Sequence, residues 1–139
     1  MKGGNQMLLT RESDYAIRIV RALRLGDKRA VKHICAEEEI PEPFTYKILK
    51  KLEKAGIAKA VRGAQGGYIL YQSIEDLTLI DIIRAIDPQF AITQCTIDGY
   101  DCNRHKQLEP CAVHDELVRI QELLIKELQT KSLADLFEL

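Results

Sequence analysis

The chain has 139 residues, of which 46% are hydrophobic and 29% charged, and its net charge is −1. This composition is typical of a globular protein and indicates one main domain. No apolar run approaches the roughly 18 residues of a membrane span, and residues 1–6 lack the apolar core of a secretory signal. We therefore expect a cytoplasmic protein without membrane contact, whose four cysteines are metal ligands or free thiols rather than structural disulfides.

The charges are unevenly distributed along the chain. Residues 1–33 carry eight Lys or Arg against three Asp or Glu, and residues 44–68 carry six against the single Glu53. Residues 110–139 reverse the balance, with three basic and six acidic side chains. A basic first half is typical of a protein that lays one face on nucleic-acid phosphates, the alternative being a solvated lysine-rich helix face.

The first half of the chain predicts three helices, over residues 11–25, 31–38 and 43–55. The second is expected to bury Cys35 as an inert thiol, and the acidic run 37–39 is expected to face solvent. The third carries four lysines, and its apolar positions predict a buried face formed by Phe44, Ile48, Leu49 and Leu52. Two short helices with a tight connection, the second rich in lysine, indicate a helix-turn-helix.

Residues 57–61 and 68–71 read as two strands around the glycine-rich run 62–67, which predicts a β-hairpin wing with a basic tip. A helix over 79–86 follows, with Thr78 and Asp81 as a capping box. The long helix expected over 111–129 has a narrow apolar stripe that suits pairing with a second helix, although packing on its own domain is the alternative. Ser132 and Asp135 predict a cap for a last short helix over 132–139.

We thus expect a mainly α fold: a winged helix-turn-helix domain with a small β-hairpin wing, plus a long C-terminal dimerisation helix. Residues 1–6 are expected to be a tail or an expression remnant, and residues 7–88 the DNA-binding domain. Residues 89–110 are expected to form a cysteine-rich loop, and residues 111–139 the dimerisation helix and the last helix.

The cysteine-rich segment is the main candidate for metal chemistry. Cys95, Cys102, Cys111 and His114 are separated by six, eight and two residues, and His105 lies between them. Thiolates with one imidazole suit an iron–sulfur cluster or zinc. A thiol switch, in which two of the cysteines form a disulfide, is a further reading.

The predicted third helix and the wing hold the candidate DNA contacts. Residues near the start of a recognition helix reach base edges, whereas lysines further along hold phosphates. The wing tip can project two side chains, and its glycines shape the turn. The expected contacts are Thr45, Tyr46, Lys47, Lys50, Lys51, Arg62, Gly63, Gln65, Gly66 and Gly67.

Three stretches resemble the IscR/NsrR/CymR family of winged-helix regulators, also called BadM-like. These are the opening motif Leu9-Thr10-Arg11-Glu12-Ser13-Asp14-Tyr15-Ala16, the recognition-helix run at 40–52, and the wing motif Val61-Arg62-Gly63-Ala64-Gln65-Gly66-Gly67-Tyr68. The residues 79–83 and the late cysteines also fit. The resemblance covers nearly the whole chain from Met7.

This resemblance implies a homodimer that binds palindromic operators in double-stranded DNA, more often as a repressor. In the IscR type, three cysteines and a histidine two residues beyond the third hold a 2Fe–2S cluster, and Cys111 and His114 reproduce that spacing. In the NsrR type an aspartate of the partner's first helix completes a 4Fe–4S site, and Asp14 stands at the matching place. We favour 2Fe–2S over 4Fe–4S, with Asp14 or His105 as the alternative fourth ligand.

The predicted function is a DNA-binding transcriptional regulator controlled by an iron–sulfur cluster that senses iron–sulfur, redox or nitric oxide status. A cluster-free CymR-like regulator of sulfur or cysteine metabolism, acting by thiol redox or a partner protein, is the alternative. A small iron–sulfur electron carrier is a third reading, but it leaves the helix-turn-helix unexplained. An enzyme is not expected, because no nucleophile–base pair or phosphate loop is present.

Overall fold

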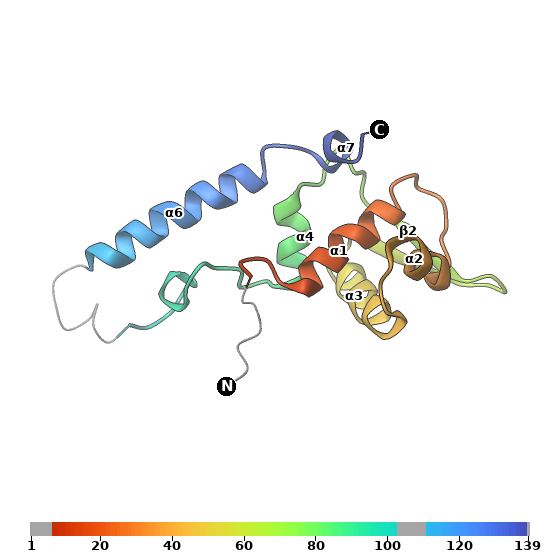
Figure 1. Cartoon of the computed structure of the whole chain (residues 1–139), viewed down its shortest axis with the longest axis horizontal. Coiled ribbons are helices and arrows are strands. Elements are labelled where there is room, and N and C mark those ends of the chain that lie inside the picture. The colour runs from red at the N-terminus through yellow and green to blue at the C-terminus, as the bar shows by residue number, and fades with distance from the viewer. Residues whose placement is uncertain (1–6, 103–110, 139) are drawn as a thin grey trace.

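The computed structural model describes residues 7–102 and 111–138. The helical body contains α1 (Arg11–Ala22), α2 (Val31–Glu38), α3 (Glu42–Lys54) and α4 (Leu79–Ile86). The strands β1 (Ala58–Val61) and β2 (Gly67–Leu70) lie between α3 and α4, and the later elements are the 3-10 helix η1 (Gln94–Thr96), α6 (Ala112–Leu128) and α7 (Leu133–Leu136). Figure 1 shows α6 as a long arm that stands apart from the helical body.

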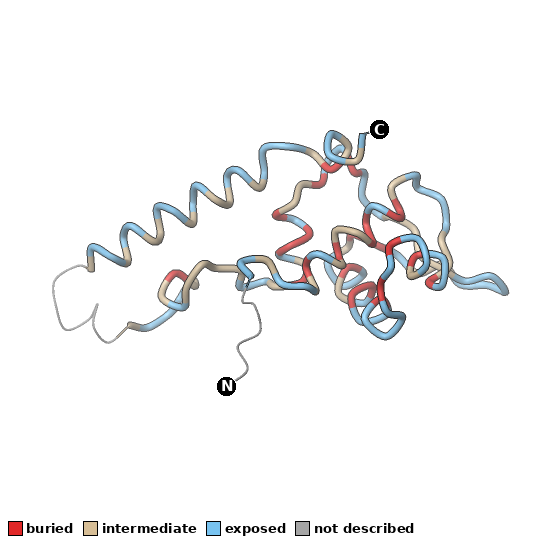
Figure 2. Tube along the Cα trace, viewed as in Figure 1, coloured by how far each residue is buried: buried red, intermediate tan, exposed pale blue. Residues whose placement is uncertain are grey.

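The hydrophobic core lies among α1, α3 and α4. Ile19, Ile48, Leu52 and Ile82 are fully buried there, at helical spacing on the inward face of each helix. The tube in Figure 2 is red mainly in this body, whereas the described residues of α6 are half-buried or exposed. The core therefore holds the helix-turn-helix rigidly, and the arm contributes little to it.

Side-chain caps begin the helices where the sequence predicts them. The Thr10 hydroxyl accepts a hydrogen bond from the Ser13 amide at 3.1 Å, and Thr78 and Asp81 form the expected capping box. Each cap satisfies an amide that the helix itself leaves without a partner. The first helix ends at Ala22 rather than at residue 25, because Leu23 already caps it with non-helical angles.

The wing is an antiparallel hairpin in which Ala58 pairs with Leu70 and Val61 with Gly67. A third segment joins it through Arg29, whose amide and carbonyl exchange 2.9 Å hydrogen bonds with the backbone of Tyr68. A side chain at Gly67 would meet the Arg29 carbonyl oxygen at 2.4 Å. Glycine is therefore required there, because the wing passes directly over the chain that leads into α2.

The end of the chain returns to the helical body. The Leu133 amide donates to the Leu77 carbonyl at 2.8 Å and the Ala134 amide to the Ile74 carbonyl at 3.0 Å. Leu133 is fully buried in the core of α1, α3 and α4, and Ser132 and Asp135 form the predicted capping box. The C-terminal end of the arm α6 is thus anchored to the helical body. Within residues 7–102 and 111–138, no helix is both long and apolar enough to cross a membrane.

Candidate nucleic-acid interface and cysteine segment

The third helix presents one polar face to solvent. Its buried side consists of Thr45, Ile48, Leu49 and Leu52. Successive residues of a helix are rotated by about 100°, so the opposite side is formed by the exposed residues Tyr46, Lys47, Lys50 and Lys54. This face is basic and accessible, as a helix that enters a groove of DNA must be.

Two expectations at the start of α3 are wrong. Thr45 is fully buried; its hydroxyl lies 3.2 Å from both the Pro41 carbonyl and the Cys35 Sγ, so it closes the turn instead of reaching DNA. Phe44, expected in the core, is 47% exposed and contacts the ring of Tyr15 edge-on at 6.0 Å. The helix begins with the small hydroxyl side chain turned inward, which rotates Phe44 to the rim.

The recognition helix and the wing flank a groove. A cavity of about 530 Å³ lies between Tyr46, the start of α2 and the wing backbone at Gly66 and Gly67. Lys32 and His33 line it from the first turn of α2, and both are exposed. Sequence reasoning missed these two residues, because nothing in the sequence shows that the start of α2 faces the wing. Arg62 and Gln65 are exposed in the wing loop, as expected for side chains that project from it.

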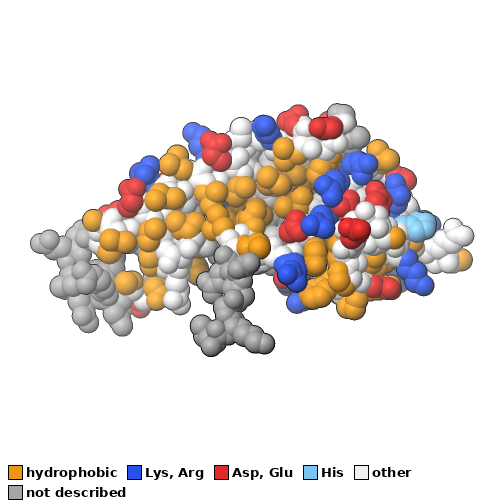
Figure 3. All heavy atoms as spheres, in the orientation of Figure 1, with side chains coloured by type: hydrophobic (Ala, Val, Ile, Leu, Met, Phe, Trp, Pro, Cys, Tyr) orange, Lys and Arg blue, Asp and Glu red, His pale blue; other side chains and the backbone are white. Residues whose placement is uncertain are grey.

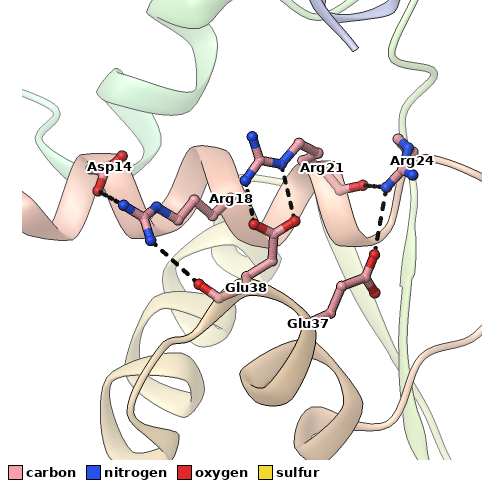
Figure 4. Close-up of polar contacts among 6 residues, drawn as sticks. All are labelled: Asp14, Arg18, Arg21, Arg24, Glu37 and Glu38. Carbon is pink, nitrogen blue, oxygen red and sulfur yellow. Dashed lines mark hydrogen bonds and ion pairs between the residues drawn. The ribbon is translucent and has the colours of Figure 1, made fainter. Parts of the chain in front are cut away.

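An ion-pair network joins α1 to α2, and Figure 4 shows it. Arg21 donates two hydrogen bonds to the Glu38 carboxylate, at 3.0 and 2.5 Å, and Arg18 donates to the Glu38 carbonyl at 3.4 Å. The bond to Glu38 raises the pKa of Arg21 above its ordinary value. The expectation that the acidic run faces solvent is wrong for Glu38, which is buried; a buried carboxylate requires such a partner.

The segment that carries Cys95 is held against α6 by the side-chain amide of Gln121. Gln121 Oε1 accepts from the Ile92 amide at 2.9 Å and from the Thr96 hydroxyl at 2.6 Å, and Gln121 Nε2 donates to the Thr96 carbonyl at 3.2 Å. Thr96 is buried as a result. The expected loop therefore contains the 3-10 helix η1, and Cys95 is its middle residue.

Two of the expected ligands share a cavity. Cys95 and His114 both line a space of about 850 Å³ between the segment 88–100 and α6. Cys111 is the N-cap of α6, and Cys102 is half-buried, but neither lines that space. In the described part of the chain, no three His, Cys, Asp or Glu side chains are grouped closely enough to hold a metal ion. The four cysteines are free thiols.

One alternative fourth ligand, Asp14, lies away from this cavity. Asp14 is 52% exposed on α1, with its carboxylate 3.1 Å from the Arg18 guanidinium. His105 lies outside the described residues. The structure therefore brings together one cysteine and one histidine of the expected set, and leaves Asp14 on an open helix face.

The arm α6 has an apolar surface that the described residues leave uncovered. Val113, Ile120 and Leu123 are 67%, 40% and 50% exposed. Figure 3 shows hydrophobic side chains gathered across the middle of one face of the molecule, between the arm and the helical body. An apolar surface of this kind is typical of a protein–protein contact.

Comparison with known proteins now identifies the family. The model of the Rrf2 family, described as an iron-dependent transcriptional regulator, matches residues 9–139. The chain belongs to the Rrf2 family. The HTH-type transcriptional regulator NsrR of Bacillus subtilis is 28% identical to this Rrf2-family chain over 102 residues, covering 71% of this chain and 67% of that protein.

Solved structures confirm the predicted winged helix-turn-helix fold. IscR of T. potens superposes with a TM-score of 0.75 at 22% identity, over 98% of this chain and 90% of that chain. CymR, the global cysteine regulator of B. subtilis, gives 0.70 at 21% identity, over 96% and 98%. The Rrf2-family chain is thus a transcriptional regulator with a DNA-binding fold, and the expectation that it is not an enzyme is confirmed.

Proposed function

We propose that the chain is a regulator, acting as a repressor, whose operator affinity is set by an iron–sulfur cluster on Cys95, Cys102, Cys111 and His114. The observation that carries the proposal is the cavity shared by Cys95 and His114 where the segment 88–100 meets α6. A thiolate and an imidazole from two different elements converge there, and the other two thiols lie on the chain that joins those elements.

The donor set fits such a cluster chemically. Thiolates are the usual ligands of iron–sulfur clusters, and a histidine among them raises the reduction potential. Cys111 and His114 are three residues apart at the start of α6, a spacing that places two side chains on the same side of a helix. Cys102 and Cys111 would have to approach Cys95 to complete the set. A 2Fe–2S cluster is the favoured group; with Asp14 of a partner subunit as fourth ligand, 4Fe–4S is the alternative.

The DNA-binding half of the proposal uses the exposed face of α3 and the wing. Tyr46 and Lys47 lie nearest the start of the helix, where side chains reach base edges. Lys50 and Lys51 are assigned to phosphates, which position the protein without reading sequence. The wing is assigned to the backbone or minor groove through Arg62, Gly63, Gln65, Gly66 and Gly67.

Dimer geometry connects the two halves. The exposed apolar face of α6 is proposed to pair with the same face of a second copy, which places two recognition helices on the half-sites of a palindromic operator. The cysteine segment joins α4 to α6, and Gln121 fastens it to the arm. A cluster bound to this segment favours one angle of the arm over another, provided that the two dimer geometries bind the cluster with different affinity.

An oxygen-free preparation tests the cluster directly. Absorption spectra and counts of iron and sulfide are compared for the natural protein and for Cys95→Ala, Cys102→Ala and Cys111→Ala, with Cys35→Ala as the control. We expect the three variants to lose the cluster and the control to keep it, because Cys35 bonds to Thr45 in the helical body. Equal iron loss in the Cys35→Ala control would contradict the ligand assignment.

Two substitutions distinguish the candidate fourth ligands His114 and Asp14. His114→Ala is expected to shift the spectrum or release the cluster, whereas Asp14→Ala is expected to leave it unchanged if His114 is the ligand. The reverse result assigns the site to Asp14 of a partner subunit and favours the larger cluster.

A cluster-free thiol regulator is the second candidate. The observation that favours it is the set of free thiols together with the lack of a three-ligand group in residues 7–102 and 111–138. It predicts a colourless protein whose DNA affinity changes on mild oxidation and no longer changes in the three cysteine variants. A protein that contains iron and sulfide in stoichiometric amounts would rule this candidate out.

A further inference from the structure

Glu12 forms a charged contact with the recognition helix. It lies in the first turn of α1, and its Oε1 is 2.7 Å from Lys51 Nζ and 4.0 Å from Lys47 Nζ. Both lysines belong to the set expected to touch DNA. One carboxylate of α1 therefore lies between two of the cations that the DNA-binding proposal uses.

The contact is part of the seam between α1 and α3. One turn along α1 from Glu12, the ring of Tyr15 meets Phe44, and Phe44 lies one turn before Lys47 on α3. Residues three or four apart share a helix face, so Glu12 and Tyr15 follow the same edge of the recognition helix that carries Phe44, Lys47 and Lys51. The carboxylate is held at the border of the DNA-facing surface by packing of the neighbouring aromatic pair.

The three charged side chains of this contact differ in how exposed they are to solvent. The side chain of Glu12 is 26% exposed, that of Lys51 36% and that of Lys47 63%. Both lysine side chains are thus more exposed than the Glu12 side chain. Lys50, by contrast, is exposed and has no ion-pair partner among the described residues. The lysines of α3 are therefore not equivalent: Lys47 and Lys51 share a carboxylate, whereas Lys50 and Lys54 are exposed without an ion-pair partner in the described part of the chain.

We propose that Glu12 is an internal competitor for the phosphates that Lys47 and Lys51 would hold, and that it lowers the affinity for DNA of any sequence. This inference rests on the proposed DNA-binding function. An arriving phosphate has to displace the carboxylate from Lys51 or approach it at close range, and either event costs part of the phosphate contact. Non-specific binding depends almost wholly on such contacts, whereas operator binding adds base contacts. Glu12 therefore weakens binding to DNA of any sequence, and in the non-specific mode it acts on the contacts that supply nearly all of the affinity.

The test measures binding of the full chain to a labelled 30-base-pair duplex of random sequence, by fluorescence anisotropy between 50 and 200 mM KCl. Glu12→Gln keeps the size of the side chain and removes its charge. We expect it to bind about three to ten times more tightly at the lowest salt, with a plot of log K against log salt that is steeper by up to about 0.9. Glu75→Gln is the matched control, because Glu75 is exposed beside the α7 contact of Ile74; it should match the natural protein.

A double variant shows whether the effect of Glu12 on DNA binding depends on Lys51. In Lys51→Gln protein, the added Glu12→Gln change should gain less than half as much, because the cation that the carboxylate neutralises is gone. Unchanged or weaker binding by folded Glu12→Gln protein, or a full gain in the Lys51→Gln background, would overturn the inference. Absence of salt-dependent binding by the natural protein would instead remove the DNA-binding function itself.

Discussion

Removing the Glu38 carboxylate should destabilise the protein far more than removing its neighbour Glu37. Both residues lie at the end of α2, and both pair with arginines of the helical body. The Glu38 side chain is 5% exposed and bound at two points by Arg21. The Glu37 side chain is 36% exposed, and its contacts with Arg24 and Arg29 are 3.7 and 3.6 Å long.

The size of the effect follows from these exposures. Breaking a fully buried ion pair by removing one partner costs about 3–5 kcal/mol. Arg21 is itself 49% exposed and regains water when Glu38 is removed, so the loss should be nearer the value of hydrogen bonds to charged groups, about 1.5–3 kcal/mol. Glu37→Ala removes two longer ion pairs that are partly exposed to solvent, and it should cost less than about 1 kcal/mol.

Urea unfolding followed by circular dichroism checks this difference, with all proteins at one concentration because a dimer unfolds in a concentration-dependent way. Glu38→Ala should unfold at lower urea than Glu37→Ala, with an unchanged slope. A gap of less than about 0.5 kcal/mol between the two variants, which is within the ordinary range of surface substitutions, would refute the reasoning that the buried carboxylate fixes α2 against α1.

Three further predictions concern the proposed site. Lys50→Ala should weaken DNA binding for every sequence alike and lower the salt slope by about 0.9; a sequence-dependent loss would instead assign Lys50 to base contacts. Gln121→Ala should release the cluster to a chelator about tenfold faster, since it removes three hydrogen bonds to the cysteine segment, whereas Gln129→Ala at the end of α6 should not. Ile120→Glu should convert the dimer to a monomer in sedimentation, with Leu136→Glu as the control; a dimer that survives contradicts pairing through α6.

The sequence predicts the elements of the fold well, because caps and glycines are local signals. The boundaries at Thr10, Thr78 and Ser132 depend on side chains that bond within three residues. The wing followed from its glycine-rich run, although the third segment at Arg29 did not, because pairing over a long sequence distance leaves no periodic signal.

The errors arose where rotation of a helix or a distant partner decides the outcome. At the start of α3 the buried face is shifted by one residue from the expectation, so that Thr45 is buried and Phe44 is exposed. Glu38 appeared to be an ordinary surface acid, since its partner Arg21 lies 17 residues earlier. The cysteines could be recognised as a set from their types, but the cavity that Cys95 and His114 share depends on α6 and could not be predicted from spacing.

The central claim is that a cluster on the cysteine segment changes how the dimer reads DNA. The most direct measurement isolates the preferred duplex from a random pool with cluster-loaded protein, and then compares its affinity for the loaded protein and for the same protein after chelation under nitrogen. The account predicts at least a tenfold difference in Kd, equal to about 1.4 kcal/mol, which disappears in Cys95→Ala protein. Equal affinities for loaded and stripped protein, both folded and dimeric, would contradict it.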